Sequence, residues 1–341
     1  MQKNYRVLKL NLYFVLYSGI IHSNSVGGRL GGKISMTLSI ASITSSGIVL
    51  TADSRQTYMN KAGMTRIGTD SAVKLFKLNN KMAVVIAGKA FFPDSSNVFK
   101  NTGWFIEEFT KKILRENLWT VREATQKLND YLIETFLNPE ETRIKDFIGN
   151  QIEAENGKEL GFDPREHNKL TYMFKDRNGK RTTRDYFLET VSMIVAGYDK
   201  DGIGRAYLAS VPDGPTLERN TESGGCLWIG QTDIIARIVK GWGWEISSLD
   251  FIKDANKKGI KVDEELNKLE YIINWGTMTL QDAIDFNVLM TRITESIQRF
   301  SDGTFMNPGG ITGVGGHVNV ATLTPDEGFC WINKRELIIA G

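Results

Sequence analysis

Residues 35 to 56, SMTLSIASITSSGIVLTADSRQ, have the pattern of a tight β-hairpin. Apolar and small polar residues alternate on one side of a turn at 44–47, and an apolar run resumes on the other side. A turn centred near residue 45 folds the chain so that Asp53 returns close to Thr37. The hairpin therefore predicts a threonine beside an acidic and a basic residue, Asp53 and Arg55, at one end of two paired strands.

The bulk composition is that of an ordinary globular protein. The chain has 341 residues, of which 41% are hydrophobic and 24% charged, and its formal net charge is +2. No large basic block is present, so we expect neither nucleic acid nor a membrane surface as a partner. Cys226 and Cys330 lack metal-ligand spacing, and we expect buried free thiols in a reducing cytosol. The 3 histidines are scattered, which disfavours a histidine metal centre or a Ser-His-Asp triad.

The first 36 residues are expected not to belong to the working protein. The apolar run from Leu10 to Ile21 imitates a signal peptide, but polar residues interrupt it and it is too short to span a bilayer. The sequence GGRLGGKIS nearly spells a phosphate-binding loop, yet Ile34 stands where a Ser or Thr belongs. We expect residues 1–36 to be an untranslated or removed leader, with translation starting at Met36, and residues 37–341 to form a single domain.

The rest of the chain alternates blocks of strands with blocks of helices. Strand patterns recur over 72–90, 191–211, 224–230 and 317–334, and helical spacing fills 101–137, 232–239 and 279–300. Asn138 and Pro139 are expected to end the second helix, and Thr279 with Asp282 forms a capping box for the long one. Two polar segments, 139–188 and 245–275, are interpreted as insertions. Such blocks favour antiparallel sheets, so we predict an α+β fold, a four-layer αββα sandwich of two antiparallel sheets with helices outside.

Three motifs in register now carry a family resemblance. MTLSIASITSSGIVLTADSR, VKLFKL and MAVVIAGKA resemble the start of proteasome β-type subunits and HslV-type peptidases, which are N-terminal-nucleophile hydrolases with the αββα fold. On this basis the chain is identified as a member of a bacterial proteasome-like branch. The resemblance implies Thr37 as the first residue of the mature chain, Asp53 sixteen positions later with Arg55 in support, Lys74 on the third strand, and a turn at Ala87-Gly88.

The chemistry explains why these residue types are needed. A threonine hydroxyl needs a base, and a free α-amine, whose pKa is about 8, can accept its proton. Lys74, kept ionised by Asp53, would lower the proton affinity of both groups. The Gly88 N–H would stabilise the oxyanion, a role that contributes about 3 kcal/mol in other enzymes. The predicted reaction is amide hydrolysis on Thr37 without a metal or cofactor.

The second half of the chain departs from the family pattern. Family members often carry Gly-Ser-Gly where this chain has Gly230-Gln231-Thr232, so the auxiliary serine is missing or replaced. An Asp and a Ser normally follow the long helix, and Ser301, Asp302 and Thr312 are the candidates here. The resemblance also implies that three residues help to shape the substrate pocket: Gln56, Ala72 and Ile86.

The function predicted from the sequence is a threonine-type endopeptidase in the cytoplasm. The resemblance implies self-association into rings, unfolded protein or peptide substrates, and an ATPase unfoldase as a partner. Two alternatives stay open. One is an amide hydrolase on the same fold that acts on a small substrate, and the other is a catalytically silent ring or scaffold subunit in which the polar segments dominate.

Overall fold

Two five-stranded sheets form the centre of the protein. The computed structural model describes residues 37–59, 65–94, 96, 98–112, 120–305, 307–308 and 313–336, so the predicted leader lies outside the described residues. The first sheet, called the β1 sheet, has the order β15 (Gly225–Gly230), β1 (Leu38–Thr44), β2 (Gly47–Ala52), β18 (Asn319–Thr324) and β19 (Gly328–Asn333). The second, called the β6 sheet, has the order β14 (Gly214–Asn220), β13 (Gly204–Ser210), β12 (Val191–Tyr198), β6 (Met82–Gly88) and β5 (Leu75–Lys77).

Every neighbouring pair in the two sheets is antiparallel. This confirms the prediction of antiparallel sheets in a chain of mixed α and β structure, whereas the complete four-layer arrangement stays a prediction. The hairpin expected around residue 45 is present, and the strand patterns over 72–90 and 191–211 form two more hairpins, β5–β6 and β12–β13. Strand β14 was not expected, and it extends the β6 sheet at one edge.

The helices flank these sheets. The longer helices are α1 (Thr102–Lys112), α2 (Val121–Leu132), α3 (Asn138–Ala154), α4 (Asp233–Lys240), α5 (Asp250–Lys257) and α7 (Leu280–Phe300). Shorter turns are the π-helix η2 (Ile133–Leu137), α6 (Val262–Leu266), and the 3₁₀ turns η3 (Trp244–Ser248), η4 (Asn267–Leu269) and η5 (Trp275–Thr277). Small hairpins pair β3 (Gln56–Met59) with β4 (Thr65–Thr69), β7 (Phe91–Pro93) with β8 (Phe99–Asn101), and β16 (Gly303–Thr304) with β17 (Asn307–Pro308).

Apolar side chains cover both faces of the central strands of each large sheet. Strand β6 reads MAVVIAG and six of its seven residues are buried. Val85 packs with Ile43 and Leu50 in a cluster between the two sheets, whereas Val84 joins the helical cluster of α1 and α2. Because successive strand residues point to opposite faces, a strand covered on both sides is apolar throughout rather than alternating.

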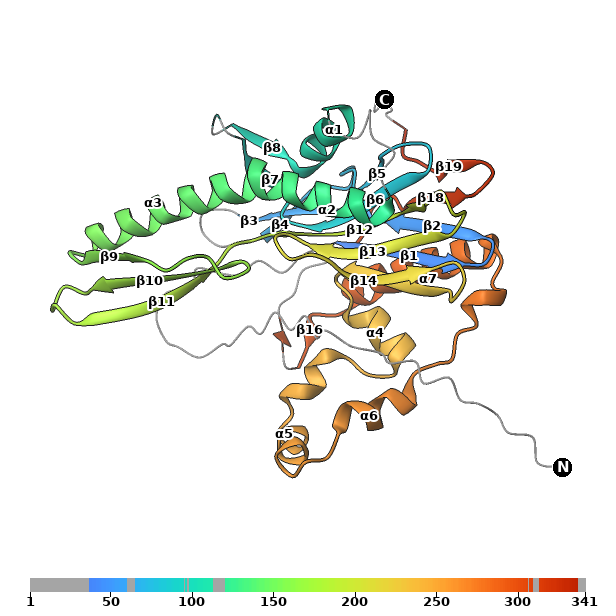
Figure 1. The fold of residues 1–341 in the computed structure, drawn as a ribbon. Coiled ribbons are helices and arrows are strands. Elements are labelled where there is room, and N and C mark those ends of the chain that lie inside the picture. The colour runs from blue at the N-terminus through green and yellow to red at the C-terminus, as the bar shows by residue number, and fades with distance from the viewer. Residues whose placement is uncertain are drawn as a thin grey trace. The chain divides into compact units, whose positions relative to one another are not determined.

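The other face of the β1 sheet is covered by different helices. Leu38 and Ile40 of β1 pack with Ile235 of α4 and Met290 of α7. Figure 1 shows α4 and α7 on one side of the strands and α1 and α2 on the other. The capping box predicted for α7 is present, with Thr279 accepting from the backbone N–H of Asp282.

The prediction that Asn138 and Pro139 end the second helix is wrong. Helix α2 passes through the π turn η2 into α3, and Pro139 lies in the first turn of α3. Proline lacks a backbone N–H and clashes with the carbonyl four residues earlier in an α-helix. It is tolerated at the start of a helix, where that N–H needs no intrahelical partner, so the chain continues as a new helix.

The segment 139–188 contains more regular structure than its polarity indicates. It holds α3 and a three-stranded sheet of β9 (Lys158–Phe162), β10 (Lys169–Lys175) and β11 (Arg181–Phe187). Ile144, Ile148 and Ile152, spaced by four residues, are buried with Leu170 and Phe174. That isoleucine stripe is a helical signal which the surrounding charges obscure.

Two further observations bear on the composition. Within the described ranges, no helix is both long and apolar enough to cross a membrane. Both cysteines are free thiols, but Cys226 is only partly buried and Cys330 is exposed. The expectation of buried thiols is therefore wrong for Cys330, which lies on the edge strand β19, where Cys330, Ile332 and Asn333 are all exposed.

Candidate active site

Thr37 immediately precedes β1 and is buried, with 6% of its surface exposed. Its carbonyl accepts a 2.6 Å hydrogen bond from the backbone N–H of Gln231, at the end of the neighbouring strand β15. Strand β1 is also tied to the other sheet, since the Ser39 hydroxyl donates to the Ile86 carbonyl over 3.1 Å. These contacts hold Thr37 at one end of the β1 sheet, close to the end of β6 in the other sheet.

Asp53 is the residue on which this region converges. It follows β2 and has no exposed surface. One carboxylate oxygen accepts from the backbone N–H of Leu38 at 3.1 Å and from Lys74 Nζ at 2.8 Å. The other accepts from the backbone N–H of Arg55 at 3.1 Å and of Gly315 at 3.0 Å. Four donors favour the charged form of the carboxylate and fix its orientation.

Lys74 is buried beside Asp53. Its ammonium donates to the carboxylate and also to the Arg55 carbonyl at 2.5 Å. Burial lowers the pKa of Lys74, and the attraction of Asp53 opposes that change. Burial likewise raises the pKa of Asp53, against the pull of Lys74 and the hydrogen bonds it accepts. The pair is thus an ion pair out of water, which holds an amine whose proton is more easily lost than that of a surface lysine.

Arg55 supports this pair from outside. Its guanidinium makes a bidentate ion pair with Asp70, with N–O distances of 2.8 and 3.0 Å. Its backbone N–H points to Asp53 and to the Gly315 carbonyl, and its own carbonyl receives Lys74. The backbone of Arg55 therefore takes part in the cluster, while its side chain anchors the segment to Asp70.

Gly88 ends β6 next to Ala87. Its φ of +117° is one that L-residues avoid, and a Cβ there would come within 2.3 Å of the Thr190 carbonyl oxygen. Gly230 has a φ of +94°, and a Cβ on it would lie 1.7 Å from the Thr37 carbonyl oxygen and 3.4 Å from the Ala87 Cβ. The ends of β6 and β15 therefore meet at Thr37. The oxyanion role of the Gly88 N–H stays a prediction.

The auxiliary residues expected after the long helix make no described hydrogen bond to the cluster, and their role stays a prediction. Ser301 caps the C-terminus of α7 and is half-buried, and Asp302 is exposed. Within the part of the chain that the structure describes, neither side chain hydrogen-bonds to Thr37, Asp53 or Lys74. Thr312 lies outside the described residues.

Sequence reasoning missed a pair of amides near the site. The Gln298 side chain of α7 accepts from the backbone N–H groups of Gly313 and Val314 and donates to the side chain of Gln231. The signal for this role is a stripe of polar residues along one face of α7, at positions spaced by three or four: Asn287, Thr291, Thr294 and Gln298. A polar stripe on the face that packs against a sheet indicates specific partners there, because unpaired buried polar groups are costly.

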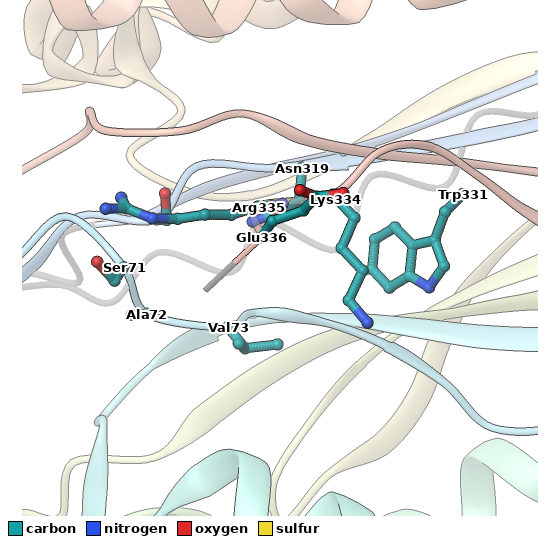
Figure 2. Close-up of a pocket in the computed structure, with 9 residues that line it drawn as sticks. Ser71, Ala72, Val73, Asn319, Trp331, Lys334, Arg335 and Glu336 are labelled. Atoms are coloured by element: carbon teal, nitrogen blue, oxygen red, sulfur yellow. Dashed lines mark hydrogen bonds between the residues drawn. The ribbon is translucent and has the colours of Figure 1, made fainter. Parts of the chain in front are cut away.

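A separate cavity of about 170 Å³ lies beside the segment that leads to Lys74 (Figure 2). In Figure 2 the segment 71–73 forms one wall, and Trp331 with 334–336 forms another. Ala72 lines it, but Gln56 and Ile86 do not, and neither does Thr37. The pocket implied by the family resemblance is therefore only partly represented by this cavity.

Comparisons with known proteins give a limited result. No family model matches the chain, and no curated protein matches it. Similar solved structures include Anbu (ancestral beta-subunit) from Yersinia bercovieri, with a TM-score of 0.42, 13% identity, and 87% of both chains covered. Another is the Anbu (Gly-1) mutant from Hyphomicrobium sp. strain MC1, with a TM-score of 0.41, 12% identity, and 88% of this chain and 86% of that chain covered.

These neighbours correct the family assignment made from the motifs. The similar structures are Anbu proteins, a distinct proteasome-like family, so the identification as a member of the proteasome β-type and HslV-type family is wrong. The fold described above rests on the strand pairing and the packing of the core, not on these two likenesses.

Proposed function

We propose that the protein hydrolyses amide bonds in peptides, with Thr37 as an N-terminal nucleophile, on a four-layer sandwich of the two large sheets and their flanking helices. The observation that carries the proposal is the buried Asp53–Lys74 pair, whose carboxylate also binds the N–H of the residue that follows Thr37. A buried ion pair of this kind seldom contributes much net stability. Its position one residue from a threonine at the end of a strand supports a chemical role.

The reaction begins when the Thr37 hydroxyl attacks the carbonyl carbon of the substrate amide. Its proton passes to the free α-amine of Thr37, while Lys74 supplies positive charge nearby. The carbon–nitrogen bond then breaks, the leaving amine takes the proton, and an ester remains on Thr37. Water hydrolyses that ester, and the hydroxyl and the amine return to their starting states.

The electrostatic arrangement supports each step. Because burial lowers the pKa of Lys74, its ammonium shares protons with neighbouring groups more readily than an exposed lysine does. Asp53 holds the lysine in place and is itself held by three further donors. In the role proposed for it, the Gly88 N–H faces the oxygen that becomes negatively charged.

We also propose that copies of the chain associate, as expected for a ring-forming hydrolase. The segment 244–272 exposes large apolar side chains, with 93% of Ile272, 71% of Tyr271 and 66% of Phe251 accessible. Exposed apolar groups that cluster in one segment mark contact surfaces. Light scattering tests this proposal: a monomeric mass contradicts it, and we expect Ile272→Lys to reduce the mass of an assembly.

The hydrolase proposal is tested on protein whose first residue is Thr37, as established by intact mass. We expect cleavage of fluorogenic peptides that is lost in Thr37→Ala and retained in Thr37→Ser, which keeps a hydroxyl. Retained cleavage in Thr37→Ala contradicts the proposal. So does full activity of a form that keeps residues ahead of Thr37, because its amine is then part of a peptide bond.

The lysine offers a matched control. Lys74→Met is expected to abolish cleavage, whereas Lys77→Met, three residues away on β5, is expected to have little effect. Lys77 is exposed, and its ammonium donates to the Asn80 side chain and lies over the Phe329 ring, away from the Asp53–Lys74 pair. Equal effects of the two substitutions contradict a chemical role for Lys74.

A further inference from the structure

Gln298 lies in the last turn of α7, where the polar stripe of this helix reaches the candidate site. Its side-chain oxygen accepts from the backbone N–H of Gly313 at 3.0 Å and of Val314 at 2.9 Å. Two backbone donors fix which end of the amide is the oxygen. The NH₂ group therefore points the other way, and it donates to the side-chain oxygen of Gln231.

The partners of Gln298 are connected to the reacting region on two sides. The backbone N–H of Gln231 binds the Thr37 carbonyl at 2.6 Å. Gly315, the residue after Val314, donates its N–H to the Asp53 carboxylate at 3.0 Å. A single side chain thus links the strand end that holds Thr37 to the loop that holds Asp53.

We propose that Gln298 is a positioning residue that sets the distance between Thr37 and the Asp53–Lys74 pair through Gln231 and the 313–315 loop. This inference rests on the proposed hydrolase function. Among the described hydrogen bonds, the Gln298 side chain binds Gln231, Gly313 and Val314 and neither Thr37 nor Asp53, so we expect it to act through the groups it holds.

Four variants test the role. Gln298→Met has a similar length but cannot hydrogen-bond. Gln298→Glu keeps an acceptor for the loop, and the Gln231 amide can turn over to donate to it. In the double variant Gln298→Glu with Gln231→Glu, two carboxylates face each other and no hydrogen bond can form between them. Gln281→Met changes the same residue type at the exposed start of α7, where its amide bonds only to Asp285 among the described hydrogen bonds, and serves as the control.

We expect kcat for peptide cleavage to fall roughly 10- to 100-fold in Gln298→Met with KM changed much less, since displacement of a reacting group by about 1 Å has effects of this size. Gln298→Glu should restore kcat, the double variant should lose it again, and Gln281→Met should match the wild type. Wild-type kcat in Gln298→Met, or an equal loss in Gln298→Glu, overturns the proposal.

A second measurement does not depend on activity. Hydrogen exchange read by mass spectrometry reports the protection of the backbone amides at 313–315. We expect faster exchange in Gln298→Met and near wild-type exchange in Gln298→Glu. If the wild type cleaves no peptide, the hydrolase proposal fails, and unchanged exchange in Gln298→Met then overturns the link proposed here as well.

Discussion

Replacement of Asp53 by asparagine tests whether the buried pair organises the site. Asparagine has nearly the same shape, but it removes the charge opposite Lys74 and replaces one acceptor oxygen by an NH₂ group. That group faces either the donors Lys74 and Leu38 or the donors Arg55 and Gly315. The variant therefore leaves the buried Lys74 ammonium without its counter-charge, and the NH₂ group of the asparagine faces other hydrogen-bond donors.

The expected loss of stability follows from burial. Removal of one partner from a buried ion pair costs about 3–5 kcal/mol, because the other charge remains out of water. Asp70→Asn is the matched control. Asp70 also lies 2.8 Å from a cation, Arg55, but 42% of its side chain is exposed, compared with 0% for Asp53. An exposed pair contributes about 0–1 kcal/mol, so the control should be nearly neutral.

Urea unfolding followed by circular dichroism measures both variants against the wild type. We expect a large drop in midpoint for Asp53→Asn and a small one for Asp70→Asn. Addition of Lys74→Met to Asp53→Asn should cost less than the sum of the single changes, because the stranded ammonium is then gone. Equal losses in the two asparagine variants, or strict additivity in the double variant, would refute the reasoning.

Three further outcomes are expected. Gly202→Ala should cost roughly 1 kcal/mol of backbone strain, because no atom lies near a Cβ at that position. Gly230→Ala should destabilise the protein well beyond this, because a Cβ there clashes with the Thr37 carbonyl. Urea unfolding midpoints compare the two variants. Thr279→Ala removes the α7 cap and should cost about 1 kcal/mol by the same assay. Burial first, and two nearby arginines second, lower the pKa of His317, so the unfolded chain binds more protons just below pH 6.5. Stability should therefore fall as the pH drops through that range, and His317→Gln should flatten the slope of Tm against pH.

The sequence predicted those parts of the fold that local patterns control. Alternation with a central turn identified the β1–β2 hairpin, and the return of the chain placed Asp53 near Thr37. The Thr279 box identified the start of α7. Each of these depends on residues a few positions apart, where the backbone allows few alternatives.

The parts that were missed depend on longer distances or on mixed signals. Pro139 is a helix breaker by itself, but the π turn before it lets a new helix begin there. The Gln231–Gln298 contact joins residues 67 positions apart, and no local pattern specifies such a pair. The role of Ser301 and Asp302, inferred from their place after the long helix, stays a prediction.

The arrangement around Asp53 explains why local sequence patterns cannot predict the geometry of the site. Its donors come from Leu38 in β1, Arg55 after β2, Lys74 before β5 and Gly315 before β18. These segments belong to both large sheets, so the carboxylate is fully satisfied only when the sheets are packed together. A polar network with one member missing is less favourable than an apolar core, because the remaining groups are buried without partners. The geometry of the site is therefore a property of the assembled core. The sequence motifs can predict which residues it contains, but not how they are arranged.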